Sequence, residues 1–352
     1  MLKTHLTVLI TTLIGCFSNP AMTNENMQNK EPKKDSSSIA LVIHGGAGTI
    51  LKKNMTDELE QTYRAKLEES LMAGYQILEN GGSSTEAVKA AIVIMENSPL
   101  FNAGKGSVFT HDGKNELDAS IMASHDLSAG AVAGVSHVKN PILLADKVRT
   151  ESKHVMMARE GAEEFAKEHN VELVDQKYFY TQRRWEQLQK VLKSTPQKSQ
   201  LSEDEAKNSD VKNSKFGTVG AVALDVNGNI TAGTSTGGMT NKRYGRIGDS
   251  PVIGAGTYAT PLCGVSATGH GEYFIRAAVT HDICALVEYT DSNIQQAADT
   301  VIHEKLVKLG GDGGVIGLDK EGNIMMSFNT EGMYRGSIDK DGKVTIKIYK
   351  DH

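Results

Sequence analysis

The sequence predicts an α+β fold in which two mainly antiparallel sheets pack face to face and helices cover both, giving four layers in the order αββα. Two apolar runs, residues 218–225 and 230–235, flank the segment Val226-Asn227-Gly228-Asn229. Asn-Gly is a strong signal for a tight hairpin turn, so these runs are expected to pair as antiparallel strands. Antiparallel strands usually alternate polar and apolar residues because one face meets water. These two scarcely alternate, which indicates a sheet covered on both faces.

The part of the chain before this hairpin is predicted to begin with a strand. Residues 39–43 are apolar and run into the glycine loop 44–48. A long helix then begins at Asp57 and ends at Asn80-Gly81-Gly82. Ser83 and Glu86 form a capping-box pattern that opens a second helix. Further short strands are expected around residues 106–109, 117–122 and 130–137, and further helices around residues 141–151, 156–169 and 182–192.

The part after the hairpin is predicted to supply the second helical layer and the last strands. Helices are expected over residues 271–289 and 293–309, followed by three or four short strands. His281 shares a helix face with Phe274 and Ala277, which favours a packed core histidine over a ligand.

Composition allows a large core and argues against some partners. The chain has 352 residues, 39% of them hydrophobic, which is enough for one large domain over residues 39–352. The net charge is −5 with mixed signs, so there is no electrostatic case for nucleic-acid binding.

The N-terminus is typical of an export signal. A short basic start is followed by an apolar run, residues 6–14, that is too short to span a bilayer. The following Leu13-Ile14-Gly15-Cys16 resembles the lipobox of bacterial lipoproteins. The resemblance implies a signal peptide over residues 1–15, a lipid on Cys16, and a periplasmic protein held at the outer membrane by a polar tether, residues 16–38. An ordinary secretory signal cut slightly later is the alternative.

The two remaining cysteines would then face an oxidising compartment. Cys263 and Cys284 could pair there, but spacing alone does not show it. Buried free thiols are the preferred interpretation.

The junction Gly217-Thr218 carries the strongest chemical signal. Residues 195–215 contain one Leu, one Ala and one Val among polar residues, and an apolar strand begins directly after Thr218. If the bond before Thr218 is broken, this threonine becomes an N-terminus with both a hydroxyl and an α-amine. The amine has a reference pKa of about 7.7–8.0, so it can take the hydroxyl proton at neutral pH. Nucleophile and general base then belong to one residue, which predicts a self-cleaving hydrolase.

Two other sequence patterns offer alternatives. Residues 233–237 match G-x-S-x-G with Ser235 as nucleophile, but that motif requires a following helix, and residues 238–245 have no helical period. Arg246 and Asp249 form either a surface salt bridge or a pair that grips a zwitterion, and spacing leaves both open. A non-catalytic lipoprotein that captures amino acids with this pair is therefore a third hypothesis.

Other residues were weighed as metal ligands or oxyanion donors. His270 and Glu272 suggest a metal site, but no second ligand group has matching spacing. The same segment lies between a strand and a helix, where backbone N–H groups can stabilise an oxyanion.

Together these segments resemble the isoaspartyl peptidase/L-asparaginase family (plant-type asparaginases) of N-terminal nucleophile (Ntn) hydrolases. The resemblance covers about residues 39–348 and implies the αββα Ntn-hydrolase sandwich. The related glycosylasparaginases share several blocks but lack the His-Gly-Gly-Ala-Gly opening. The matching segments are residues 43–48, 101–106, 217–222, 234–242, 245–251 and 267–272.

The resemblance implies roles for individual residues. Thr218 is the nucleophile, freed by cleavage after Gly217, and Thr236 tunes it. Thr268 and Gly269 form the oxyanion hole and contact the substrate. Arg246 holds the substrate α-carboxylate and Asp249 its α-ammonium, and Asn102 orients the nucleophile and supports processing. A structural sodium ion would be held by the main-chain carbonyls of Met95, Glu96, Ser98, Phe101, Ala103 and Lys105.

The resemblance also implies the reaction and the assembly. Cleavage gives an α subunit, residues 39–217 with a flexible linker at 195–216, and a β subunit, residues 218–352. The mature enzyme would release aspartate from isoaspartyl peptides or from L-asparagine through a threonine acyl-enzyme, without a catalytic cofactor. An (αβ)2 heterotetramer is expected. The sequence does not rank asparagine against isoaspartyl dipeptides.

Overall fold

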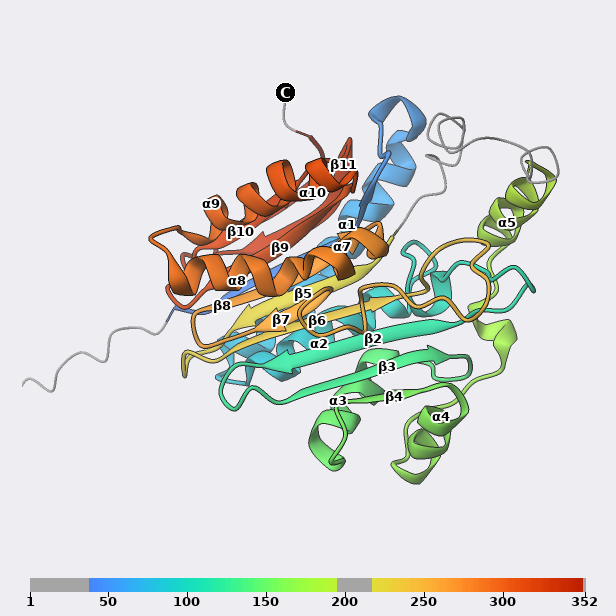
Figure 1. Cartoon of the computed structure of the whole chain (residues 1–352), viewed down its shortest axis with the longest axis horizontal. Coiled ribbons are helices and arrows are strands. Elements are labelled where there is room, and N and C mark those ends of the chain that lie inside the picture. The colour runs from blue at the N-terminus through green and yellow to red at the C-terminus, as the bar shows by residue number, and fades with distance from the viewer. Residues whose placement is uncertain (1–37, 195–216, 351–352) are drawn as a thin grey trace, which may run out of the picture. The chain divides into compact units, whose positions relative to one another are not determined.

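The computed structural model describes residues 38–194 and 217–350, and Figure 1 shows two sheets in this region. The predicted signal peptide, Cys16, nearly all of the tether and the linker 195–216 lie outside the described residues. The larger sheet has, in spatial order, β12 (Val344–Tyr349), β11 (Gly332–Ile338), β1 (Ala40–Gly48), β5 (Val219–Leu224), β6 (Ile230–Thr236), β2 (Leu117–Ala123), β3 (Ala129–Val135) and β4 (Met156–Ala158). The smaller sheet has β10 (Ile324–Phe328), β9 (Gly313–Asp319), β8 (Cys263–Gly269) and β7 (Thr257–Ala259).

All neighbouring strands in both sheets are antiparallel except β3 and β4, which are parallel. The hairpin β5–β6 lies at the centre of the larger sheet. Its turn has a hydrogen bond from Gly228 N to Asp225 O, and Gly228 has a positive φ of 79°. The prediction of an Asn-Gly hairpin is confirmed.

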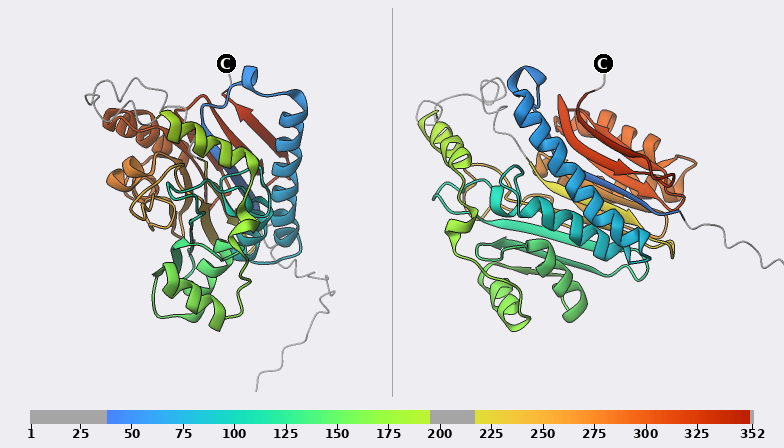
Figure 2. Two further views of the ribbon diagram at one scale, coloured as in Figure 1. Left: turned by 90° about the vertical axis from the view of Figure 1, so that its right-hand side faces the viewer. Right: turned by 180° about the vertical axis from the view of Figure 1, so that it is seen from behind.

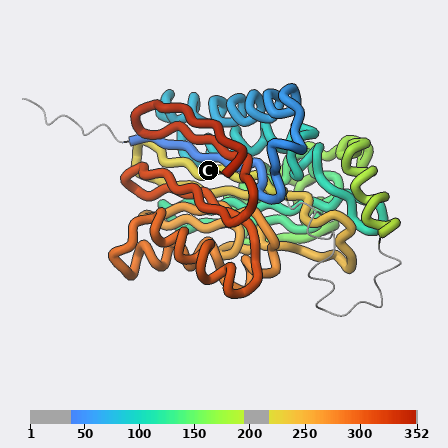
Figure 3. Tube along the Cα trace, turned by 90° about the horizontal axis from the view of Figure 1, so that it is seen from above, coloured from blue at the N-terminus to red at the C-terminus, as the bar shows by residue number. Residues whose placement is uncertain are grey.

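Helices cover the outer face of each sheet, as Figure 2 shows from two sides. The larger sheet is covered by α1 (Asp57–Glu79), α2 (Ser84–Glu96) and α3 (Pro141–Glu151). The smaller sheet is covered by α7 (Gly271–Ala277), α8 (Val279–Tyr289), α9 (Ile294–Asp299), a π-helical turn (Thr300–Lys305) and α10 (Leu306–Leu309). Two further helices, α4 (Arg159–Glu168) and α5 (Gln182–Ser194), follow β4. Figure 3 shows α1 and the helices of the C-terminal half on opposite sides of the strands.

Each interface between layers has its own apolar cluster. Alternate residues of β1 divide between two of them: Leu41 and Ile43 pack with the helices α1 and α2, whereas Ala40 and Val42 pack with the smaller sheet. A third cluster joins the smaller sheet to its helices. Both faces of the larger sheet are therefore buried, and the predicted four-layer α+β fold is confirmed.

Two helices of the first layer start at capping side chains, of which Ser83 was predicted and Thr56 was not. The side chain of Thr56 accepts a hydrogen bond from Leu59 N at the start of α1. The side chain of Ser83 accepts one from Glu86 N at the start of α2. Each bond satisfies an N–H group that the helix itself leaves unpaired.

Several local predictions are wrong. Residues 44–48 are not a loop but the end of β1, which continues past an irregularity between His44 and Gly46. Residues 106–109 are described but do not form the expected strand. A 3-10 turn spans Gly104–Gly106, and residues 107–109 have no regular secondary structure. The helix expected over residues 271–289 is interrupted at Ala278, which has a φ of 48°. The interruption rotates the second half, so His281 is exposed rather than packed in the core.

The preference for free thiols is also wrong. Cys263 and Cys284 form a disulfide with a Cα–Cα distance of 5.6 Å. Cys263 begins β8 and Cys284 lies on α8, so adjacent layers bring them within bonding distance although they are 21 residues apart. Spacing in the sequence could not show this because the contact depends on how the helix packs on the sheet.

Over residues 38–194 and 217–350, no helix is both long enough and apolar enough to cross a bilayer.

Candidate active site

Thr218 lies immediately before β5, at the centre of the larger sheet. It is 6% exposed, and its Oγ1 donates a hydrogen bond of 3.1 Å to Thr236 Oγ1 at the end of β6. The two threonines meet because β5 and β6 are the arms of one hairpin, in which Val219 pairs with Ser235.

Two donors hold the carbonyl of the preceding residue. Asn102 Nδ2 donates to Gly217 O at 2.7 Å, and Thr236 Oγ1 donates to the same oxygen at 3.0 Å. Asn102 is itself fixed, because its Oδ1 accepts from Val108 N at 2.9 Å. Donors aimed at a carbonyl oxygen can stabilise the negative charge that develops there during nucleophilic attack.

His44 holds the backbone of Thr218. Its Nδ1 lies 3.0 Å from Thr218 O, and its Nε2 lies 3.0 Å from Ser266 Oγ. Burial lowers the pKa of His44 to about 3, so the ring is neutral. A neutral ring that donates from Nδ1 to the carbonyl accepts from the Ser266 hydroxyl at Nε2.

Buried hydroxyl groups extend this contact between the two sheets. Ser266 Oγ is 2.7 Å from Thr234 Oγ1, and Thr257 and Ser120 continue the chain. Ser120 Oγ finally donates to Ser250 O at 2.6 Å. The network thus runs from Thr218 to Ser250, the neighbour of Asp249 in the chain.

Sequence reasoning assigned His44 no role. Its position in the opening glycine motif was the available signal, but its partners lie directly before β5 and on β8, far away in the chain.

The predicted oxyanion residues lie at the end of β8, next to β1. Thr268 is fully buried, and its Oγ1 accepts from Ala47 N at 3.3 Å. Gly269 must be glycine, because a Cβ atom there would lie 2.6 Å from Asp312 O.

Arg246 and Asp249 meet at the start of α7. A Cβ atom on Gly271 would lie 2.8 Å from Asp249 Oδ1 and 2.9 Å from Arg246 Nη2, so both groups lie against this glycine. Within the described residues, the ion pair of Arg246 is with Glu272 and not with Asp249: Nε and Nη2 each donate to Glu272 at 2.8 Å. The salt-bridge interpretation is therefore wrong, and sequence reasoning missed Glu272 as the partner of Arg246.

Asp249 has an unusual environment for an acid. Its side chain is buried, and its Oδ2 has no hydrogen-bond partner among the described residues. Burial raises the pKa of Asp249 to about 7, although the nearby charge of Arg246 acts in the opposite direction. Such a carboxylate is prepared to receive a cationic group.

Ser235 lies on the opposite face of β6. It is fully buried and donates a hydrogen bond of 2.6 Å to Glu96 Oε1 of α2. Burial raises the pKa of Glu96 to about 7. Because β6 is followed by turns and bends rather than a helix, the nucleophile-elbow hypothesis is wrong.

The loop after α2 contains the main-chain carbonyls of the predicted sodium site. A Cβ atom on Gly104 would lie 2.2 Å from Glu96 O, and one on Gly106 would lie 2.1 Å from Phe101 O. The two glycines therefore let the backbone approach these main-chain carbonyls closely. Carbonyl oxygens suit hard cations, so these residues can supply ligands of the predicted kind, and the ion itself stays a prediction. No group of three His, Cys, Asp or Glu side chains in the described residues could hold a metal.

Comparison with known proteins identifies relatives of this chain. The sequence model of a family described as asparaginase matches residues 37–348. The isoaspartyl peptidase of Escherichia coli (strain K12) is 47% identical, with 88% of this chain and 96% of that protein covered. The isoaspartyl peptidase of Salmonella typhimurium (strain LT2) is 46% identical, with 88% and 98% covered. The plant-type L-asparaginase of Pyrococcus furiosus is 40% identical, with 84% and 94% covered.

Proposed function

Because this chain belongs to the asparaginase family, we propose that it is a self-processing threonine amidohydrolase that cleaves isoaspartyl peptides, the side-chain amide of L-asparagine, or both. The names of its relatives support these two substrates, and none of those named above is a glycosylasparaginase. One observation carries the mechanism: the Thr218 hydroxyl contacts Thr236, which with Asn102 holds the Gly217 carbonyl.

The first step is cleavage of the chain. Thr218 Oγ1 attacks the Gly217 carbonyl carbon, and Asn102 Nδ2 and Thr236 Oγ1 stabilise the charge on its oxygen. The C–N bond breaks, the nitrogen takes the proton from the hydroxyl, and an ester joins Gly217 to Thr218. Water hydrolyses the ester, leaving a carboxylate on Gly217 and a free amine on Thr218.

The mature reaction uses that amine as general base. Its reference pKa of about 7.7–8.0 lets it accept the hydroxyl proton as Oγ1 attacks the β-carbonyl of an aspartyl group. Thr268 and Gly269 would donate to the resulting oxyanion. Ammonia or an amino acid leaves with the proton, and water then releases aspartate from the acyl-enzyme.

The substrate would be bound through its α-ammonium and its α-carboxylate. Asp249 would receive the α-ammonium at its unpaired Oδ2, and Arg246 the α-carboxylate. Glu272 accepts from Nε–H and from one Nη2–H of Arg246. Both Nη1–H groups and the second Nη2–H therefore remain for the substrate carboxylate.

A sodium ion in the loop after α2 would have a structural role. It would be held by the carbonyls of Met95, Glu96, Ser98, Phe101, Ala103 and Lys105. This would fix the loop that carries Asn102, and no catalytic cofactor is needed.

We also propose export and assembly. The lipobox-like segment supports lipidation of Cys16 and retention in the periplasm at the outer membrane. The Cys263–Cys284 disulfide supports an oxidising compartment. An (αβ)2 heterotetramer is proposed from the family resemblance. The mass of the mature N-terminal peptide distinguishes a lipidated Cys16 from an ordinary cleaved signal.

Purified wild-type protein and Thr218→Ala test the proposal together. On denaturing electrophoresis the wild type should give two fragments that meet at Thr218, and the variant one inactive chain. A fully active wild type with an intact Gly217–Thr218 bond would contradict the mechanism. The Thr268→Ala chain should still be cleaved before Thr218. Its hydrolysis of substrate should be about 10²–10³-fold slower than that of the wild type, as expected for loss of one oxyanion donor.

A further inference from the structure

A pocket of about 220 Å³ opens beside Gly217. Its lining includes Asn102, Gly217 and residues 45–48 of β1. An aromatic wall contains Tyr63 and Tyr334, whose rings stack with centroids 4.3 Å apart. The pocket therefore borders Gly217, whose carbonyl Thr218 would attack in the uncleaved chain.

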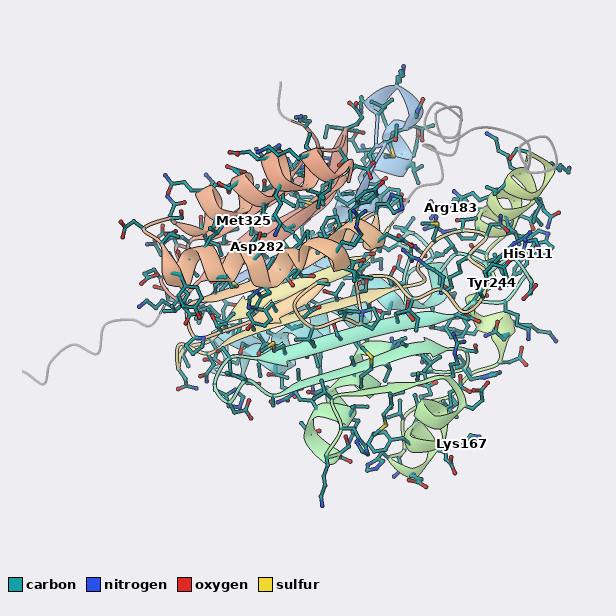
Figure 4. All side chains as sticks on the ribbon, in the orientation of Figure 1. His111, Lys167, Arg183, Tyr244, Asp282 and Met325 are labelled. Atoms are coloured by element: carbon teal, nitrogen blue, oxygen red, sulfur yellow. A yellow bond between two sulfur atoms is a disulfide. The ribbon has the colours of Figure 1, made fainter. Side chains whose placement is uncertain are left out.

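The remaining wall carries two arginines from the first turn of α5, Arg183 and Arg184; Figure 4 labels Arg183. Arg184 is 7% exposed, and it donates to Gly106 O at 2.8 Å and to Gln187 Oε1 at 3.0 Å. Arg183 donates to the Tyr63 hydroxyl at 2.8 Å and to Leu100 O at 2.7 Å. All of these acceptors are neutral.

Within the described residues, neither guanidinium has an ion pair with a carboxylate. Burial, followed by the charge of Arg183, lowers the pKa of Arg184 to about 10, so the side chain remains charged at neutral pH. A buried charge without a counter-charge is costly, and the planar guanidinium matches a carboxylate. The two arginines thus give this wall a positive charge that a ligand carboxylate would neutralise.

The position of the pocket indicates which carboxylate. The aspartyl half of the substrate would be held by Arg246 and Asp249, and neither lines this pocket. The group on the other side of the scissile amide needs a separate space beside Thr218, and this pocket borders Gly217, the residue directly before it. In an isoaspartyl dipeptide this group is an amino acid with a free α-carboxylate, whereas asparagine releases only ammonia.

We propose that this pocket binds the leaving residue of isoaspartyl dipeptides and that Arg183 and Arg184 receive its α-carboxylate. This subsite rests on the proposed function. It predicts a preference for dipeptides with a free C-terminus over asparagine. Cleavage also leaves a carboxylate on Gly217, which is a second source of the same chemistry, so the test must separate the two.

The experiment compares kcat/KM of the cleaved enzyme on β-aspartyl-leucine, on its C-terminal amide and on L-asparagine. Arg183→Met is the main variant because Arg183 is less buried than Arg184. Arg184→Lys is the second variant, since lysine keeps the positive charge but lacks the planar guanidinium that can bind a carboxylate with two parallel hydrogen bonds. Lys190→Met, which removes an exposed charge from the same helix outside the pocket, is the matched control.

The wild type should prefer the acid to the amide by about 10- to 100-fold, as expected for hydrogen bonds between charged groups. Arg183→Met should abolish this preference mainly through KM, while its activity on asparagine changes less than about twofold. Arg184→Lys should weaken the preference, and Lys190→Met should retain it.

Equal use of the acid and the amide by the wild type would overturn the subsite. An equal loss on all three substrates in Arg183→Met would also overturn it, and would place the arginines on the Gly217 terminus or in a structural role. Hydrolysis of none of the three by cleaved wild type would instead refute the proposed function, and the subsite with it.

Discussion

Two acids, Glu96 at the end of α2 and Asp249 in the loop after β6, are buried in opposite ways. On the helix-facing side of the larger sheet, Glu96 accepts hydrogen bonds from Ser235 Oγ, Asn140 Nδ2 and Ile142 N at 2.6, 3.0 and 3.1 Å. On the side of the smaller sheet, Asp249 keeps one buried oxygen without a partner among the described residues. Burial raises the pKa of both to about 7, so the pKa alone does not separate them.

The hydrogen-bond partners of the two carboxyl groups do distinguish them. Glu96 joins the end of α2 to the first turn of α3, where its charge faces the positive end of the helix dipole. A carboxylate whose hydrogen bonds are complete within the protein stabilises the fold, whereas one left incomplete is available to a ligand. We therefore assign Glu96 to structure and Asp249 to substrate binding.

Replacing Asp249 by Asn should give the largest effect on activity. The variant loses the charge that would pair with the substrate ammonium, so kcat/KM should fall about 10²–10³-fold. Stability should be unchanged or slightly higher, because an unpaired buried charge is removed. Kinetics and thermal unfolding of the cleaved protein measure both. A destabilised variant with normal kcat/KM would reverse the assignment.

Asp249 should also make stability depend on pH. Its pKa is raised in the folded protein, so between the ordinary value near 4 and about 7 the folded state holds a proton that the unfolded state has lost. Stability should therefore fall as pH rises through this window, by up to about 1.4 kcal/mol per pH unit.

Burial also raises the pKa of Asp118 and of Glu96, so both make stability fall with rising pH as Asp249 does. The contribution of Asp249 is therefore obtained by comparing a variant at this position with the wild type. The melting temperature of Asp249→Asn minus that of wild type should increase from pH 5 to pH 8. A constant difference would show that Asp249 is ionised throughout.

Changing Glu96 should affect stability instead. Glu96→Gln places an amide donor where the native oxygens face donors from Ser235, Asn140 and Ile142, which should cost about 2 kcal/mol. Thermal unfolding measures the loss, and kcat/KM of the folded fraction should stay within a few-fold of wild type. A greater loss of activity than of stability would give Glu96 a functional role.

The sequence predicted those parts of the site whose signals are local. The Asn-Gly hairpin brings Thr218, directly before β5, next to Thr236 at the end of β6, and the polar linker before Gly217 marked the proposed cleavage position. The family resemblance implied that Arg246 and Asp249 bind the same ligand, which stays a prediction, and the comparisons confirm the resemblance itself.

Contacts between distant segments were not predictable in this way. Ser235 and Glu96 are 139 residues apart, and the chain between them gives no sign that they meet. Ala278 is a good helix former, so nothing local marks the break there. In the fold, His281 N at the start of α8 bonds to Gly254 O of a distant loop, and such tertiary contacts override the local preference.

Ser235→Ala should have the smallest effect and tests the comparison most directly. The change removes one of three hydrogen bonds to Glu96 and should cost about 1–2 kcal/mol of stability. Because the Ser235 side chain faces α2 rather than Thr218, cleavage and kcat/KM should remain close to wild type. Thr234→Val is the matched variant on the opposite face, where it breaks the hydroxyl network below the nucleophile. It should slow the reaction more than Ser235→Ala does, even if both lose similar stability. Inactivation by Ser235→Ala in a folded, cleaved protein would mean that the two faces of β6 are not functionally distinct.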